Sequence, residues 1–225
     1  MYAQDVSWEE FKSHTGKTAV LVFGAMEPHG KHLPLSVDNL IPWELAKRLE
    51  KEREIILFPQ VNFGYLYSLK RFPGAVSISF DTLRRYSKDI FSSLLKDGFT
   101  RLFVIIGHGG NTGPVKLALR ELSDSHEFRA CVVEWWTLID VEAGHADEAE
   151  ASLTLASGGS LRAKPIPEQC RSYVGEVVPT PDDVFPSGHH GKVENISKER
   201  GEELMGRIVK KFAEIIDADL MLERK

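Results

Sequence analysis

Several side chains that can bind metal ions lie close together near the N-terminus, in the stretch MEPHGKHLPLSVDN. They are Glu27, His29, His32 and Asp38. Glu27 and His29 are spaced i, i+2, so both side chains point the same way in an extended segment, which Pro28 favours. Carboxylates and neutral imidazoles are ligands that zinc, manganese and iron accept. The stretch predicts a metal site, although an exposed polar loop could carry the same spacing. His32 could orient this loop through a hydrogen bond or be purely structural.

A glycine-rich segment, GHGGNTG at 107–113, carries the next candidate ligand. It lacks the lysine of a P-loop and the glycine spacing of a dinucleotide-binding turn, so a phosphate site is not expected. Its glycines allow tight turns that leave the imidazole of His108 free to face a cleft. Asn111 can fix this loop or bind substrate. Together with the first stretch, the segment favours His108 as a metal ligand over a plain strand-to-helix turn.

The segment GHADEAEAS at 144–152 adds carboxylates at a predicted helix start. On a regular helix, positions i and i+2 point about 200° apart, so Glu148 and Glu150 cannot both face one cleft. Glu150 lies on a small, apolar side with Ala146 and Leu153, where desolvation raises the pKa of a carboxyl group toward the range useful for proton transfer. We predict that Glu150 transfers protons and that Glu148 is a capping or solvent-facing residue.

Apolar runs that alternate with helical patterns must position these residues. Strands are predicted at 18–25, 54–60, 100–107 and 128–136, and helices at 82–97, 113–124 and 196–217, with a further helix that has Pro42 in its first turn. This alternation predicts an α/β layer fold around a mostly parallel sheet.

The carboxyl ends of parallel strands converge at one edge of a sheet, where ligands bind. Glu27 and His29 follow the first predicted strand, and His108 follows the third. Trp135 and Trp136 end the fourth strand and could wall a substrate pocket or pack as core and rim. The predicted site therefore lies at this edge.

The segment 157–190 is rich in Gly, Pro and Ser and has no clear period. We expect an extended excursion that could contact substrate or another subunit. Within it, His189 and His190 are interpreted as residues of a flexible surface loop. Lys70 and Arg71, which precede an F-P-G turn, could meet an anionic group on the substrate.

The composition bounds the class of protein. With 225 residues, of which 42% are hydrophobic, the chain can bury one substantial core, so residues 1–225 are predicted to form one domain. A formal net charge of −5 gives no attraction to nucleic acid or anionic lipid, and neither partner is expected.

The apolar runs are too short to span a membrane, no secretory signal pattern is present, and the two cysteines lack C-x-x-C spacing. A cytoplasmic protein is the simplest expectation.

The three motifs taken together resemble the creatininase (creatinine amidohydrolase) family. E-P-H-G-x-H-L-P-L-x-x-D, G-H-G-G-N and H-A-x-E-x-E-x-S occur here in the family's order over roughly residues 18–155, and RFPGAVSIS at 71–79 resembles its F-P-G segment. The resemblance implies a three-layer α/β/α fold, two divalent metal ions per chain, often a homohexamer, and hydrolysis of non-peptide C–N amide bonds.

The resemblance also implies roles for individual residues. Glu27 would bind one metal and His29 the other, Asp38 would bridge the two, and His108 would complete part of the shell. His145 would lie beside the substrate.

Glu150 matches a residue that the family places beside the metal-bound water. The chain also departs from the family pattern. Creatininase proper has a glutamate where Gly110 stands and a tryptophan where Val141 stands. These departures leave the metal chemistry intact but weigh against creatinine as the substrate.

We therefore predict a dinuclear metal-dependent amidohydrolase that acts on a small cyclic amide, lactam or formamide, with zinc, manganese or iron as the metal. Glu150, helped by His145, would protonate the leaving nitrogen. An alternative within the family is a formylaminopyrimidine-nucleotide deformylase of riboflavin and deazaflavin synthesis, although GAMEPHGKHLPL is closer to the general family pattern. An alternative of another class is a non-catalytic metal-binding scaffold subunit; structural zinc sites are usually closed and rich in cysteine, unlike this one.

Overall fold

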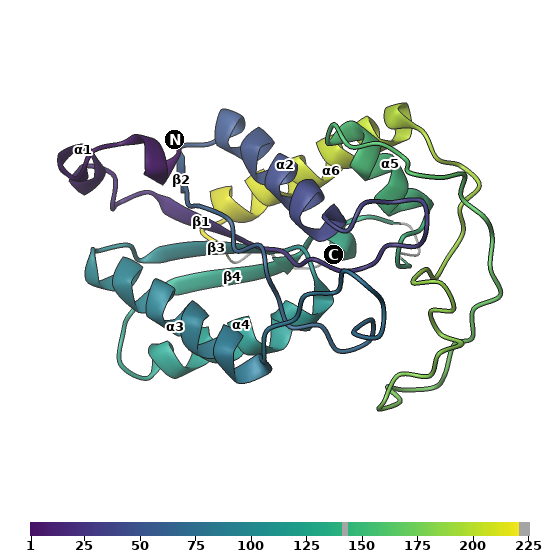
Figure 1. The fold of residues 1–225 in the computed structure, drawn as a ribbon. Helices are drawn as coiled ribbons and strands as arrows, with labels where there is room; N and C mark the ends of the chain where they lie inside the picture. The colour runs from purple at the N-terminus through teal and green to yellow at the C-terminus, as the bar shows by residue number, and fades with distance from the viewer. Residues whose placement is uncertain (141–143, 221–225) are drawn as a thin grey trace.

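The computed structural model describes residues 1–140 and 144–220. Its centre is a sheet with strand order β2-β1-β3-β4 (Figure 1). The strands are β1 (Thr18–Phe23), β2 (Ile55–Leu57), β3 (Arg101–Ile106) and β4 (Arg129–Glu134). All three strand pairings are parallel, which confirms the predicted parallel sheet.

Helices cover both faces of this sheet (Figure 1). One face packs against α2 (Val37–Glu52), α5 (Glu148–Ala156) and α6 (Lys198–Asp217), and the other against α3 (Phe80–Lys96) and α4 (Thr112–Ser123). A short helix, α1 (Trp8–Lys12), precedes β1. Alternate residues of β1 belong to the two cores: Val20 and Val22 to the first, Leu21 and Phe23 to the second. This two-sided burial explains why the strands are apolar throughout, and it confirms the three-layer α/β/α architecture.

The start of α2 differs from the prediction. The helix begins at Val37, so Pro42 lies inside it rather than in its first turn. Asp38 therefore lies in the first helical turn, where the helix dipole favours a carboxylate. The earlier start fixes Asp38 on a rigid element instead of leaving it in the preceding loop.

Between α5 and α6, the described chain at 157–197 contains no helix and no strand, and it runs down one side of the molecule (Figure 1). This confirms the predicted excursion.

The interpretation of its two histidines as surface-loop residues is wrong. His189 is only 1% exposed, and its ring centroid lies 5.8 Å from that of His32. His190 forms an isolated antiparallel bridge with His145, so the excursion folds back onto the edge of the sheet.

No helix within the two described ranges is both long and apolar enough to cross a membrane.

Candidate metal centre

The structure gathers the predicted metal ligands and the predicted proton donor around one small cavity at the carboxyl edge of the sheet, with His29 buried behind its lining. Glu27 and His29 follow β1, and His108 follows β3. Asp38 comes from the first turn of α2 and Glu150 from the first turn of α5. The cavity has a volume of about 130 Å³, and Glu27, Asp38, His108, His145 and Glu150 line part of it.

Two overlapping groups of ligand atoms share one carboxylate. Glu27, Asp38 and His108 form one group, and His29, Asp38 and Glu150 form the other, with the ligand atoms of each group within 4.8 Å of one another. Oδ2 of Asp38 lies 3.2 Å from His108 Nδ1, and its Oδ1 lies 3.0 Å from His29 Nε2. The two oxygens of Asp38 therefore face different histidines, as a bridging carboxylate requires.

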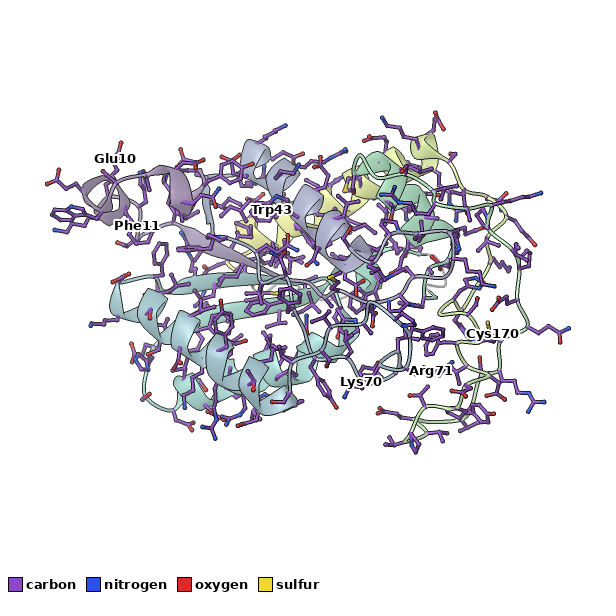
Figure 2. All side chains as sticks on the ribbon, viewed as in Figure 1. Glu10, Phe11, Trp43, Lys70, Arg71 and Cys170 are labelled. Atoms are coloured by element: carbon purple, nitrogen blue, oxygen red, sulfur yellow. The ribbon has the colours of Figure 1, made fainter. Side chains whose placement is uncertain are left out.

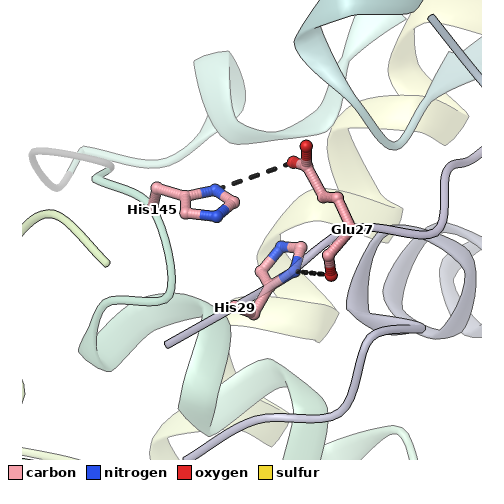
Figure 3. A group of neighbouring side chains, drawn as sticks. All are labelled: Glu27, His29 and His145. Carbon is pink, nitrogen blue, oxygen red and sulfur yellow. Dashed lines mark hydrogen bonds and ion pairs between the residues drawn. The ribbon is translucent and has the colours of Figure 1, made fainter. Parts of the chain in front are cut away.

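A third group joins Glu27, His29 and His145 (Figure 3). His145 Nδ1 lies 3.9 Å from Glu27 Oε1, and the rings of His29 and His145 lie 4.3 Å apart between centroids. His145 thus lines the cavity next to both ligand groups.

Backbone carbonyls orient the three imidazoles. Each ring has one nitrogen within hydrogen-bond distance of a carbonyl oxygen: His29 Nδ1 to Glu27 O at 3.1 Å, His108 Nε2 to Tyr65 O at 3.1 Å, and His145 Nε2 to Pro28 O at 2.8 Å. Because a carbonyl oxygen only accepts, these nitrogens carry the proton. In a neutral ring the other nitrogen then presents its lone pair to the cavity, and hydrogen bonds of this kind orient the histidines that bind metal ions in other proteins.

The charge balance of the cluster also fits metal ions. Glu27, Asp38 and Glu150 bring three carboxylates into a buried site, which is costly without positive charge. Burial raises the pKa of Glu27 above its usual range and raises the pKa of Glu150 to about 8. Burial alone would lower the pKa of His29, but Asp38 and the other carboxylates raise it to about 10. Without a metal ion, the cluster therefore favours bound protons at the positions where a cation would bind.

Within residues 1–140 and 144–220, Nε2 of His29 and Oδ2 of Asp38 are buried and unpaired. Each faces a nearby atom, at 3.0 and 3.2 Å, but in the neutral rings both atoms of each pair are acceptors. Unpaired buried polar atoms are costly, and coordination to a metal would satisfy both. The donor set, the oriented lone pairs and these two atoms all fit a pair of divalent ions.

Ala146, between His145 and Asp147 at the edge of the site, has a strained backbone conformation. Ala146 has a φ of +54°, a left-handed conformation that non-glycine residues seldom adopt. Its N–H donates to Glu150 Oε2 at 2.6 Å, and its carbonyl accepts from His32 Nε2 at 2.9 Å. Such conformations cost about 1–3 kcal/mol and persist where surrounding contacts enforce them. His32 therefore supports the site through Ala146, which favours the first of the two roles considered for it.

The two glutamates of α5 diverge as predicted, but the surroundings of Glu148 differ from the prediction. Asp147 caps the helix by accepting hydrogen bonds from the N–H groups of Ala149 and Glu150. Glu150 points into the cluster, whereas Glu148 Oε1 lies 2.7 Å from Nη1 of Arg200 on α6 and is only 14% exposed. Glu148 thus joins two helices rather than facing solvent or capping.

The predicted substrate-binding residues divide into two kinds. Asn111 is fully buried: its Nδ2 donates to Gly24 O at 2.9 Å and its Oδ1 accepts from Tyr65 N at 3.0 Å. This arrangement matches the loop-fixing alternative for Asn111. Trp135 and Trp136 both line the cavity and pack edge to face, with centroids 5.7 Å apart.

Gly110 occupies the position where the family resemblance implied a glutamate in creatininase proper. A side chain there would overlap with Tyr65 O and crowd His108 Nε2, so this backbone has no room for a carboxylate. Glu150 is the residue that gives the His29 group a second carboxylate. Val141, the position of the absent tryptophan, lies outside the described residues.

A parallel α/β/α fold with buried carboxylates and oriented imidazoles at the carboxyl edge of its sheet is typical of a metal-dependent enzyme. The chain belongs to the creatininase family: the family's sequence model, described as creatinine amidohydrolase, matches residues 4–216.

Curated relatives include both amidohydrolases and peptidases. Creatinine amidohydrolase of Pseudomonas putida is 28% identical over 153 residues, which cover 62% of this chain and 59% of that protein. The mycofactocin precursor peptide peptidase of Mycolicibacterium smegmatis is 30% identical over 149 residues, 63% of this chain and 59% of that protein. The matches span about half to three fifths of the curated relatives. The curated relatives are hydrolases, and this chain shares their family.

Solved structures confirm the fold. A crystal structure of creatinine amidohydrolase has a TM-score of 0.86 at 24% identity and covers 99% of this chain and 98% of its own. Similar creatininase structures include a mutant described as Zn-Zn type and a manganese form. A putative creatinine amidohydrolase from Bacteroides fragilis has a TM-score of 0.74 at 21% identity, with 100% and 98% coverage.

Proposed function

We propose that this protein is a dinuclear metal-dependent amidohydrolase that cleaves the C–N bond of a small cyclic amide, lactam or formamide. The observation that carries the proposal is the position of Asp38, whose two oxygens belong to two separate ligand groups. A single metal site would not need a carboxylate shared in this way.

Glu27, Asp38 and His108 would hold one ion, and His29, Asp38 and Glu150 the other. Zinc, manganese and iron all suit these ligands, and zinc and manganese occur in creatininases of the same fold. When bound, such a pair supplies Lewis acidity, which polarises an amide carbonyl and lowers the pKa of water.

His145 is proposed to bind and orient the substrate through Nδ1. Its Nε2–H donates to Pro28 O, which leaves Nδ1 facing the cavity as an acceptor. Burial, with His29 next to it, also lowers the pKa of His145 to about 3, so the ring is neutral. A neutral acceptor can hold a substrate N–H group but cannot supply the proton for the leaving nitrogen. This differs from the helping role expected from the sequence.

Glu150 is proposed to move that proton. Its Oε2 accepts from the N–H of Ala146, so Oε1 is the atom left to take a proton from the attacking water and pass it to the leaving nitrogen. Nitrogen is a poor leaving group unless it is protonated, so this transfer is needed for C–N cleavage. Trp135 and Trp136 line the same cavity and are proposed to contact the substrate.

Three further expectations belong to this proposal: one domain over residues 1–225, a cytoplasmic location and a homo-oligomer of six chains. A stable, active monomer in sedimentation would contradict the last.

A second candidate is hydrolysis of a peptide bond, which the similarity to mycofactocin precursor peptide peptidases favours. The deformylase alternative, which acts on a formylaminopyrimidine nucleotide, differs from both in its substrate. The scaffold alternative is opposed by the three carboxylates of the cluster, a surplus that a structural site does not need.

The test is a substrate screen on metal-loaded protein with cyclic amides, formamides and short peptides. We expect turnover of amides or formamides that is abolished by a chelator and restored by zinc, manganese or iron. Turnover of peptides alone would support the peptidase candidate, and no metal-dependent turnover of any amide bond would contradict the proposal.

A further inference from the structure

A second cavity, with a volume of about 290 Å³, adjoins the candidate metal centre. We call it the outer pocket. Its walls include Tyr67, Tyr173, Val177, Val184, Phe185 and His190. All but Tyr67 come from the excursion between α5 and α6. The outer pocket is thus formed where this irregular segment folds back toward the sheet.

Two aromatic side chains separate the outer pocket from the metal centre. The ring of Phe185 lies 5.5 Å from that of His145, between centroids, and the ring of Tyr67 lies 6.4 Å from that of His108. His190, another wall residue, exchanges both backbone hydrogen bonds with His145 at 2.6 and 2.7 Å. The two cavities therefore lie within about one side chain of each other. This short separation brings the outer pocket within reach of a group attached next to an amide in the metal centre.

The chemistry of the outer pocket favours a neutral, apolar group. The side nearest the metal centre, with Tyr67 and Phe185, is aromatic, and Val177 and Val184 add aliphatic surface, as in small-molecule sites. Polar residues line the rest of the outer pocket: Ser68, Arg171, Ser172, Glu176 and Thr180. The nearby cations have partners: Arg171 Nη1 lies 3.4 Å from Asp183 Oδ2, and Arg71 Nη1 lies 2.6 Å from Asp182 Oδ1. Arg71 also donates to Phe185 O at 2.8 Å and lies beside the excursion (Figure 2). Arg71 therefore secures the pocket wall, and the anion-binding role suggested for it is not favoured.

We propose that the outer pocket receives a neutral apolar ring carried next to the scissile amide, so that the preferred substrates are aryl-substituted amides rather than the smallest lactams or formamides. The substrate class rests on the proposed function, because the amide is placed at the metal centre. The occupancy of the outer pocket by an apolar ring can be tested separately.

Two valines of the excursion provide a matched test. Val177 lines the outer pocket, whereas Val174 is fully exposed and is not a wall residue. Val177→Trp should fill the pocket, and Val174→Trp adds the same bulk outside it. The measured preference is kcat/KM for N-benzylformamide divided by kcat/KM for N-methylformamide. We expect Val177→Trp to lower this preference by at least about tenfold, as the loss of an apolar subsite does. Val174→Trp should leave this preference unchanged.

Binding separates the outer pocket from the catalytic proposal. Ligand-observed NMR would compare phenylacetamide with acetamide on the metal-loaded parent and both variants. The pocket is supported if phenylacetamide binds more tightly than acetamide to the parent and to Val174→Trp, and this advantage is lost in Val177→Trp. This conclusion holds even if no amide is hydrolysed. Absence of hydrolysis would count against the proposed function alone. Equal binding by all three proteins overturns the pocket proposal. A change of oligomeric state in Val177→Trp alone also overturns it, because the pocket would then be a contact between chains.

Discussion

The metal centre and the outer pocket adjoin each other but are built in opposite ways. The metal centre is charged and buried, and its residues come from strand ends and from the first turns of α2 and α5. The outer pocket is open, with Tyr67 49% exposed; aromatic and aliphatic side chains form part of its wall, and most of the wall is a segment without helix or strand. Regular elements hold the chemistry in place, while an irregular segment shapes what reaches it.

This difference has a mechanistic consequence. A buried, charged cluster cannot lose one member without leaving others unpaired, so substitutions there should affect every substrate. The wall of an open pocket can change without disturbing the cluster, so substitutions there should change the preference among substrates. The following variants test the difference, from the largest expected effect to the smallest.

Asp38→Ala should have the largest effect, because it removes the carboxylate common to both ligand groups. We expect loss of both ions. Turnover should fall by more than the roughly 10–100-fold that is typical when a hydrogen-bond partner of a metal ligand is removed. Elemental analysis and turnover of the purified variant would measure this. A variant with a full metal complement and normal activity would show that Asp38 does not bridge.

Glu150→Gln should abolish nearly all turnover, because an amide of the same shape cannot carry a proton. The ion held by Glu27, Asp38 and His108 should remain, since Glu150 is not in that group. Glu148→Gln is the matched control on the same helix, and its turnover should be close to that of the parent. If instead Glu148→Gln is inactive and Glu150→Gln is active, the proton donor has been assigned to the wrong glutamate.

His32→Phe should have an intermediate effect on kcat, about 10–100-fold, because it removes the donor to the Ala146 carbonyl that supports the site. Kinetic measurements should show a smaller change in KM, since His32 does not line the cavity. His32→Gln can present an N–H group near the position of Nε2 and should recover part of the activity. Equal activity of the parent and His32→Phe would show that this hydrogen bond does not position catalytic groups.

Glu148→Gln should have the smallest effect, a loss of about 1 kcal/mol or less in the free energy of unfolding. Burial raises the pKa of Glu148, but Arg200 and backbone N–H groups outweigh it and lower the pKa overall. A carboxyl group with a lowered pKa stabilises the fold above its unfolded pKa of about 4.3, and that contribution is lost as the pH falls. Denaturant titrations should therefore show a difference at neutral pH that shrinks in acid. A difference that grows in acid would contradict this assignment.

The sequence predicted the parts of the molecule that local patterns determine. Apolar runs predicted four strands, and the rule that ligands gather at their carboxyl ends placed Glu27, His29 and His108 at one edge. Pro42 misled the prediction of the start of α2, because a proline inside a helix resembles one in its first turn.

What could not be predicted depends on contacts between distant segments. The Glu148–Arg200 pair joins residues 52 positions apart. His189 is buried only because the excursion folds back over His32, and no local pattern records that return. The positive φ of Ala146 is likewise imposed by His32 and Glu150 rather than by its own side chain.

The central claim is that two overlapping ligand groups hold two ions, and metal stoichiometry tests it most directly. The purified chain would be reconstituted with zinc, manganese or iron, freed of excess metal, and measured by elemental analysis alongside Asp38→Ala. We predict about two divalent ions per chain in the parent and none in the variant, because two-metal hydrolase sites hold a pair of ions through a shared ligand. A parent chain that retains no transition metal after reconstitution would contradict the account.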